Sequence, residues 1–380
     1  MEGMDVMGTY LFQNFFKGKR VLVTGHTGFK GSWLTLWLVQ LGAHVAGFSA
    51  YYPSEPCNFK LLGLERFIEH HEGDIRDSDT LLKVFEHYKP HIVFHCAAQP
   101  LVRRSYKEPK LTFDTNLGGT VNVLECIRRS GCVEATVIIT SDKCYRNAEW
   151  VWGYREIDRL GGDDPYSASK ACAEIAIRSY CSSYFNKEGG VALASTRAGN
   201  VIGGGDWAED RIVPDCVRAW SEGREALIRS PRATRPWQHV LEPLSGYLWL
   251  GALLGKGEIK GGEAFNFGPQ SDVIKTVSEL ITMFQHYWKR AQWRVEEGDV
   301  WVKESGLLKL CCDKALSLLD WRAILNFEET VELTAQWYKS LYEDKGNMYE
   351  VSEAQIERYC MLAGERGARW ALVRSEARHD

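Results

Sequence analysis

The feature that most constrains the fold is a strand, a glycine-rich turn and a helix that follow one another directly near the start of the chain. Residues 19–24 form a short apolar run, typical of a buried strand in a parallel sheet. The turn 25–31 reads Gly-His-Thr-Gly-Phe-Lys-Gly, and an apolar helix is expected over 32–41. In this context the glycines permit a tight turn and the close approach of a pyrophosphate, whose charge the helix N-terminus favours. The chain therefore predicts a Rossmann-type α/β fold with a dinucleotide site.

Further strands and helices alternate along the first half, which predicts a doubly wound parallel sheet. We expect an NAD-binding domain over 1–200 and a smaller α/β substrate domain over 201–380. An apolar helix at 242–255 is expected to return to the first domain. Other expected segments are strands at 43–49, 91–98, 135–140 and 191–199, a loop at 99–106, a long helix at 110–130, later helices near 275–288, 312–320, 328–343 and 353–363, and a peripheral tail at 365–380.

Composition excludes several functional classes. The formal net charge of −4 provides no basic field for nucleic acid, and no apolar stretch is long enough to cross a membrane. The eleven cysteines are scattered and odd in number, without a CxxC pair, so we expect a reducing, cytoplasmic compartment. His87, His91 and His95 are spaced by four residues, but Pro90 interrupts any helix there, and we expect no metal site.

Tyr166 and Lys170 are four residues apart, just after Pro165, which can open a helix. Alone, such a pair is usually a helix surface pair. As a functional pair, the lysine ammonium would lower the pKa of the tyrosine, and a phenolate accepts a proton from an alcohol. The preceding strand delivers Ser141, Asp142 and Lys143 to its carboxyl end, where doubly wound sheets bind ligands. Together these residues predict oxidation of an alcohol at the dinucleotide site.

The end of the second strand distinguishes the two nicotinamide cofactors. Ser49 stands where a carboxylate often holds the adenosine ribose, and no arginine is present there for a 2′-phosphate. NAD is therefore favoured over NADP. Ala97 and Ala98 are small, as required where a dinucleotide crosses a strand end. The loop 99–106 contains Arg103, which either contacts phosphate or is solvated.

The segments 23–33, 140–145, 161–170 and 235–242 together resemble the CDP-glucose 4,6-dehydratases, a branch of the extended short-chain dehydrogenase/reductase superfamily. The resemblance covers roughly residues 15–360. The loop His-Thr-Gly-Phe-Lys-Gly, and Asp-Lys where relatives have Asp-Glu, separate the chain from the dTDP-glucose dehydratases.

The resemblance implies a lyase that forms CDP-4-keto-6-deoxyglucose and water from CDP-glucose for deoxysugar and O-antigen precursors. Tyr166 would take the sugar 4-hydroxyl proton, Asp142 would act as the acid at C6, and Lys143 would act as the base at C5. Ser141 would orient the substrate hydroxyl, and Lys170 would also reach the nicotinamide ribose. A homodimer or homotetramer is expected, because long helices pair subunits in this superfamily.

The resemblance also implies two sets of binding residues. Those expected to hold NAD are Gly25, Thr27, Gly28, Phe29, Lys30, Gly31, Asp74, Ile75, Ala97, Ala98, Gln99, Asn116, Tyr166 and Lys170. Those expected to hold the nucleotide sugar are Arg103, Asn200, Arg211, Arg235 and His239.

Two other functions remain open at this point. A nucleotide-sugar 4-epimerase on the same scaffold needs no acid or base beyond the tyrosine, so Asp142 and Lys143 argue against it. A non-catalytic NAD-sensing protein would not need Ser141, Tyr166 and Lys170.

Overall fold

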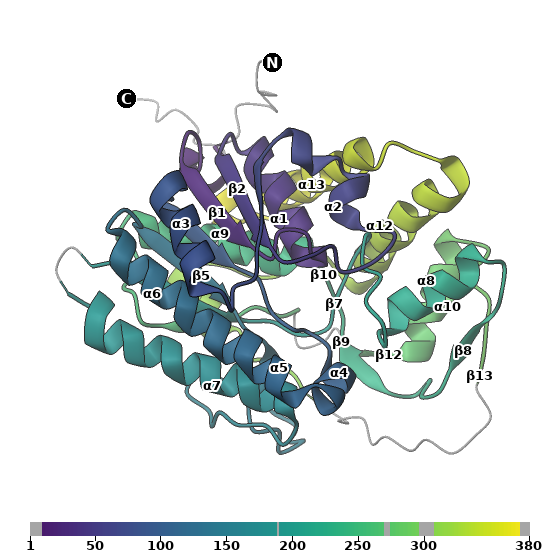
Figure 1. Cartoon of the computed structure of the whole chain (residues 1–380). Helices are drawn as coiled ribbons and strands as arrows, with labels where there is room; N and C mark the ends of the chain where they lie inside the picture. Colours follow the sequence, from purple (N-terminus) through teal and green to yellow (C-terminus); the bar gives the residue numbers. More distant parts are fainter. Residues whose placement is uncertain (1–9, 188–189, 270–273, 296–307, 373–380) are drawn as a thin grey trace, which may run out of the picture.

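The computed structural model describes residues 10–187, 190–269, 274–295 and 308–372. A parallel sheet of seven strands forms its centre, in the order β11-β6-β5-β4-β1-β2-β3 (Figure 1). Its strands are β1 (Arg20–Thr24), β2 (His44–Ser49), β3 (Glu69–Glu72), β4 (Ile92–His95), β5 (Ala135–Ile139), β6 (Ala192–Arg197) and β11 (Ala264–Asn266). The expected doubly wound Rossmann-type sheet is confirmed.

Alternate strand residues face two separate apolar layers, as the period of a strand requires. Val23 and Val137 belong to the core under α1 (Phe29–Gln40) and α9 (Leu241–Gly255). Leu22 and Ile138 belong to the opposite layer, under α3 (Ser78–Tyr88), α6 (Thr120–Ser130) and α7 (Pro165–Tyr180). Figure 1 shows α6 and α7 running side by side over their face of the sheet. Burial on both faces explains why β1, β4 and β5 are almost continuously apolar, whereas the edge strand β3 is polar and partly exposed.

The second half adds a smaller group of elements beside the carboxyl edge of the sheet. Short strand pairs join β7 to β10, β9 to β12 and β8 to β13. The remaining elements here are β7 (Val201–Ile202), β8 (Ala226–Ile228), β9 (Thr234–Pro236), β10 (Gln238–His239), β12 (Ile274–Thr276), β13 (Trp293–Val295), α8 (Ile212–Ser221), α10 (Val277–Tyr287), α11 (Asp313–Leu319), α12 (Phe327–Lys339), η6 (Ser340–Asp344) and α13 (Met348–Glu365). α9 packs on β5 and β6 and α13 packs on α1, and both helices also contact elements of this second group.

The long helix expected over 110–130 is present but irregular. It consists of α5 (Pro109–Phe113), the π-helical η3 (Asp114–Gly119) and α6. A Cβ at Gly119 would meet the Ile75 side chain at 2.4 Å, so this glycine lets the helix approach the sheet edge. Gly118 has open space around its Cα.

Two expectations were wrong. The loop 99–106 contains a short helix, α4 (Val102–Lys107). The tail beyond residue 365 is not peripheral as far as residue 371, because Trp370 is buried and stacks on Phe12, with ring centroids 5.0 Å apart. η1 (Leu11–Asn14) and η7 (Arg369–Ala371) thus close one end of the core together, a contact between distant parts of the chain that no local pattern reveals.

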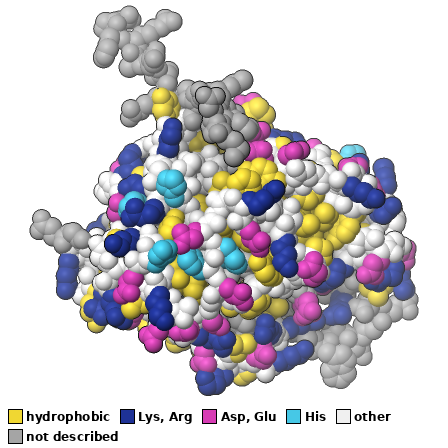
Figure 2. All heavy atoms as spheres, turned by 45° about the horizontal axis from the view of Figure 1, so that its top comes forward, with side chains coloured by type: hydrophobic (Ala, Val, Ile, Leu, Met, Phe, Trp, Pro, Cys, Tyr) yellow, Lys and Arg dark blue, Asp and Glu magenta, His cyan; other side chains and the backbone are white. Residues whose placement is uncertain are grey.

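Acidic and basic side chains are interspersed over the face shown in Figure 2. Among the described residues, no helix is long and apolar enough to span a bilayer, and no cluster of three potential ligands could hold a metal ion. All eleven cysteines are free thiols.

The remaining short elements are α2 (Asn58–Leu61), η2 (Leu64–Arg66), η4 (Asp142–Cys144) and η5 (Cys181–Phe185).

Candidate active site

The glycine loop between β1 and α1 forms a close-fitting cradle. A Cβ at Gly25 would lie 2.6 Å from the Ala97 amide nitrogen, and one at Gly31 would lie 2.1 Å from the Gly25 carbonyl oxygen. Gly25 also has a φ of +73°, which disfavours any other residue. Backbone therefore packs on backbone between the ends of β1 and β4, where the sequence places a dinucleotide.

The start of α1 has the properties of a pyrophosphate site. Gly28 precedes the helix without a side-chain cap, and no acidic residue lies in the first turn. Within the described structure, the amides of Phe29, Lys30 and Gly31 donate to no backbone carbonyl. Unsatisfied amides at a helix N-terminus bind anions, so the residues present fit the diphosphate of NAD.

The adenosine end is built from side chains that motif reasoning did not predict. The Ser49 hydroxyl lies 2.9 Å from His26 Nδ1, and His26 Nε2 lies 2.7 Å from His70 Nδ1. Burial and the neighbouring His70 lower the pKa of His26 to about 3, so the ring is neutral. This chain of hydrogen bonds stands beside the position of the missing carboxylate. Asp74 is held by an ion pair with Arg76, and Ile75 is buried.

The predicted catalytic residues converge where β5 ends and α7 begins. Ser141 donates a hydrogen bond to Asp142 Oδ1 at 3.0 Å and accepts one from the Lys143 amide at 3.2 Å. The Ser141 hydroxyl also faces the hydroxyl of Tyr166 on α7. Asp142 lines a small cavity with Gly199, Pro236 and Gln238. Burial raises the pKa of Asp142 despite the nearby Lys143, which favours the protonated carboxyl that a general acid requires.

The pKa of Tyr166 does not fall in this structure, although the sequence predicts that Lys170 lowers it. Burial raises the pKa of Tyr166 to about 12, although the Ser141 hydrogen bond opposes the rise. Burial, with the nearby Lys30, lowers the pKa of Lys170 to about 8, and its ammonium donates to the Ile139 carbonyl at 3.4 Å. The prediction of a lowered tyrosine pKa is therefore wrong for the chain without ligands, because desolvation dominates and the charges that act on Tyr166 are those of Asp142, Arg211 and Asp164.

Lys30 is partly buried and belongs to this charged group. Burial, followed by the effect of Arg211, lowers the pKa of Lys30 to about 8, and Cys96, Asp142 and Asp206 act in the opposite direction. Arg211 donates to Asp206 Oδ2 at 3.0 Å. The first turn of α1 thus brings a second lysine to the catalytic end of the cofactor site.

Asn116 organises the loop that follows β4. Its side chain accepts from the Gln99 amide at 2.8 Å and donates to the Gln99 carbonyl at 3.1 Å and to Ser169 at 2.9 Å. Asn116 lies in the π-helical segment η3, so this irregular part of the helix holds the backbone of Gln99 in position. The loop is thereby tied to α7 directly beside Lys170.

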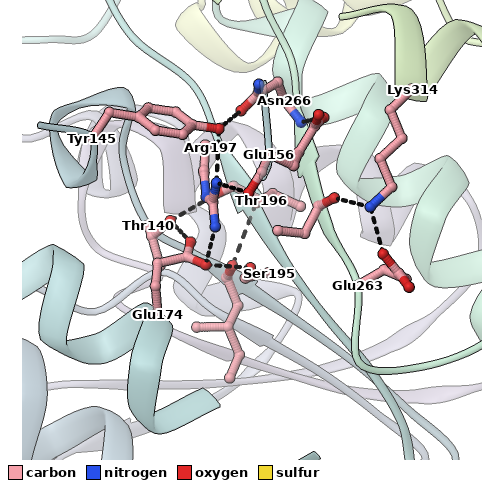
Figure 3. A network of polar contacts seen from close by, with 12 residues as sticks. Thr140, Tyr145, Glu156, Glu174, Ser195, Thr196, Arg197, Glu263, Asn266 and Lys314 are labelled. Atoms are coloured by element: carbon pink, nitrogen blue, oxygen red, sulfur yellow. Dashed lines mark hydrogen bonds and ion pairs between the residues drawn. The ribbon is translucent and has the colours of Figure 1, made fainter. Parts of the chain in front are cut away.

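A buried ion pair supports the catalytic strand from behind (Figure 3). Arg197 on β6 donates to Glu174 on α7 at 2.7 Å and to the Tyr145 hydroxyl at 2.7 Å. Glu174 also accepts from Thr140 and from Ser195. The network joins β5, β6 and α7 one helical turn beyond Lys170.

Only some of the five predicted substrate-binding residues lie near the predicted catalytic residues. Arg211 reaches the catalytic group, and Asn200, with a φ of +46°, lies next to Gly199 beside Asp142. Arg103 is exposed and pairs with Asp210 at 2.6 Å. Arg235 lies on β9 and donates to the Thr234 carbonyl at 2.8 Å.

His239 differs from the expectation for a substrate-binding residue. It is completely buried, and its ring packs edge-on against Trp33, with centroids 6.2 Å apart. This burial argues against direct contact with a substrate. The family resemblance implied a substrate-binding role for His239, whereas the fold places its side chain in the core.

Two site residues were missed by sequence reasoning. Asp206, the partner of Arg211, ends a run of glycines that could have marked it. Glu174 is four residues beyond Lys170 on the same helix face, a spacing that could have indicated a connection.

Comparison with known proteins agrees with this geometry. Residues 22–334 match the family model described as GDP-mannose 4,6 dehydratase. The chain is 46% identical over 352 residues to a CDP-glucose 4,6-dehydratase of Salmonella typhimurium, covering 91% of this chain and 98% of the relative. The chain belongs to the nucleotide-sugar 4,6-dehydratase family. Most of this dehydratase, including both the glycine loop and the catalytic helix, lies within the matched region.

Solved structures share the fold of the dehydratase. An epimerase from Methanothermobacter thermautotrophicus superimposes with a TM-score of 0.75 and 25% identity, covering 88% of this chain and 96% of that one. A dTDP-glucose 4,6-dehydratase from Bacillus anthracis in complex with NAD gives 0.69 and 23% identity, with coverage of 85% and 97%. Dehydratases and epimerases thus share this scaffold, and the reaction must be argued from the site.

Proposed function

We propose that the protein is a CDP-glucose 4,6-dehydratase, a lyase that converts CDP-D-glucose into CDP-4-keto-6-deoxy-D-glucose and water. The observation that carries this assignment is the position of Asp142 and Lys143 beside Ser141 and Tyr166. An acid and a base next to an alcohol-oxidising pair are what elimination requires. The extensive similarity to the Salmonella enzyme supports the same activity and substrate.

NAD is the cofactor, and when bound it supplies a hydride acceptor at the sugar C4 and a hydride donor at C6. Ser141 would orient the 4-hydroxyl, and Tyr166 would accept its proton as the alcohol is oxidised. This role requires the phenolate form, which the positive charge of bound NAD would favour relative to the chain without ligands. Lys143 would remove the proton from C5, which the adjacent ketone has acidified, and a proton would return to C5 when C6 is reduced. Asp142 donates a proton to the departing 6-hydroxyl, and water leaves. A buried, protonated carboxyl suits this last role.

The remaining predicted residues complete the binding site in this proposal. Gly25, Thr27, Gly28, Phe29 and Gly31 surround the cofactor diphosphate, and the unsatisfied amides of α1 support this assignment. Asp74 and Ile75 lie at the adenosine, and Ala97, Ala98, Gln99 and Asn116 line the middle of the cofactor. The nucleotide sugar is held by Arg103, Asn200, Arg211 and Arg235. Its binding site lies mainly in the domain formed by residues 201–380.

We also propose that the enzyme is cytoplasmic and oligomeric. Its eleven free thiols suit a reducing compartment. Ile175 on α7 and Tyr184 just beyond it are half exposed, which suits pairing of the long helices between subunits. Size-exclusion chromatography with light scattering tests the oligomeric state.

A 4-epimerase is the principal rival, because epimerases share the fold. Purified enzyme should be incubated with NAD and, separately, with CDP-, dTDP-, UDP- and GDP-glucose. We expect a product of CDP-glucose that is lighter by one water and that carries a base-labile 4-ketone. A product of unchanged mass would instead establish epimerisation, and faster turnover of another nucleotide would correct the substrate.

A further inference from the structure

The position of Lys30 is defined by the packing of α1 against the loop after β7. The Trp33 indole donates to the Gly204 carbonyl at 2.8 Å, one helical turn beyond Lys30. The neighbouring Phe29 ring lies against Gly203, 3.2 Å from where a Cβ would stand. These two contacts fix the first turn of α1 between the sheet and the segment that carries Asp206 and Arg211.

The charged and titratable groups around Lys30 come from every element that meets there. Cys96 follows β4, Asp142 follows β5, and Lys170 projects from α7. Asp206 and Arg211 come from the loop before α8, where they pair with each other. In the described part of the chain, no hydrogen bond or ion pair is made by the Lys30 ammonium.

Such an arrangement is unfavourable for the folded chain by itself. Two lysines in a desolvated site repel each other, and an apolar side chain at position 30 would avoid that cost. Burial is the largest cause of the lowered pKa of each lysine, about 8 in both cases, and Lys30 lowers the pKa of Lys170 further, yet both remain mainly protonated at neutral pH. The repulsion would affect the reaction if the two ammonium groups lay beside a bound group whose own charge changes during that reaction.

We propose that Lys30 and Lys170 form a pair of ammonium groups that disfavours the cationic, oxidised nicotinamide relative to the neutral, reduced ring. The proposal rests on NAD being the cofactor. Hydride transfer moves two electrons and a proton nucleus from the sugar C4 to the ring, which loses its positive charge, while the hydroxyl proton passes to Tyr166. C4 becomes a ketone. Removing a cation from between two ammonium groups makes that oxidation more favourable.

A lysine in a glycine loop has a second chemical option, which is to bind the cofactor phosphates. The neighbours of Lys30 favour an effect on the nicotinamide over binding of the phosphates, because Asp142, Lys170 and Cys96 all belong to the catalytic end. The two roles differ in one measurable respect. A phosphate contact acts on every ligand that has the diphosphate, whereas the proposed pair acts only on the charge of the nicotinamide.

The test is binding of NAD, NADH and ADP-ribose, measured by calorimetry near neutral pH without sugar nucleotide. The full-length chain, freed of bound nucleotide, is compared with Lys30→Met, and Lys30→Gln serves as a second neutral variant. We expect both variants to shift the ratio of NAD to NADH affinity toward NAD by roughly tenfold, while ADP-ribose binding is unchanged. Lys30→Arg, and Lys83→Met on the solvent-facing side of α3, should keep the original ratio.

Equal weakening of all three ligands would assign Lys30 to the phosphates and overturn the proposal, as would an unchanged ratio. Failure of the proposed reaction is a separate result, since dinucleotide binding does not depend on turnover of CDP-glucose. A wild-type chain that binds neither NAD nor NADH would overturn both.

Discussion

The Arg197 guanidinium lies 2.7 Å from the Glu174 carboxylate, and both side chains are at most 4% exposed. Burial alone would raise the pKa of Glu174, but Arg197 together with the hydrogen bonds from Thr140 and Ser195 outweighs it and holds that pKa below its ordinary value. The carboxylate therefore stays ionised behind the catalytic strand. Its contacts to Thr140 and Ser195 fix β5 and β6 at the point where they deliver Ser141 and Gly199.

Removing the arginine should destabilise the fold strongly. Arg197→Met leaves a buried carboxylate unpaired, and we expect a loss of about 3–5 kcal/mol in the free energy of unfolding. The matched control is Arg128→Met, whose pair with Glu125 is exposed and should contribute little to stability. Urea denaturation followed by circular dichroism measures both. Similar losses for the two variants would contradict a special role for the buried pair.

Asp142→Asn should separate oxidation from elimination. The amide keeps the shape of the side chain but cannot donate an acidic proton to the 6-hydroxyl. We expect C4 oxidation to continue while water loss slows about 10²–10⁴-fold. Reduced nicotinamide would then accumulate on the enzyme after substrate is added, visible by its absorbance. Equal slowing of both steps would count against Asp142 as the acid.

Lys143→Ala tests the base for C5. The backbone amide of Lys143 is held by Ser141, so loss of the side chain should leave the η4 turn (Asp142–Cys144) intact. We expect turnover to fall about 10²–10⁴-fold, and solvent deuterium incorporation at C5 to fall with it. Full turnover with ordinary incorporation would exclude this lysine as the base.

Gly199→Ala should disturb Asp142 without changing any titratable group. A Cβ at position 199 would lie 1.8 Å from Asp142 Oδ2, so the carboxyl must move. We expect slowed elimination with accumulation of reduced nicotinamide, as for Asp142→Asn. Gly118→Ala is the control, because nothing lies within 4 Å of its added methyl group. Normal turnover in Gly199→Ala would show that the acid tolerates displacement.

Glu242 should make stability depend on pH. Burial raises its pKa to about 7 from an ordinary 4.5, although the Leu325 and Ile324 amides and the Tyr359 hydroxyl donate to it. Since the folded state holds the proton more tightly, its contribution to stability declines as pH rises from about 4.5 to about 7. Over that window Glu242→Gln should gain about 3 kcal/mol relative to wild type. Parallel stability curves for the two proteins would contradict the raised pKa.

Much of the site follows from local sequence. The glycine loop, the Tyr166–Lys170 spacing and the placement of Ser141 at a strand end each depend on a few consecutive residues, so pattern alone predicted them. The same holds for the parallel sheet, because strands buried on both faces must be continuously apolar.

Tertiary structure decided the remaining features, since desolvation and long-range contacts have no local signature. It placed His239 in the core, stacked Trp370 on Phe12, and raised the pKa of Tyr166 where the spacing had predicted a fall. It also turned Lys30 from the glycine loop toward Asp142 and Lys170. The sequence by itself determined which chemical groups the site contains, whereas the packing of distant segments around them determined their charge and their neighbours.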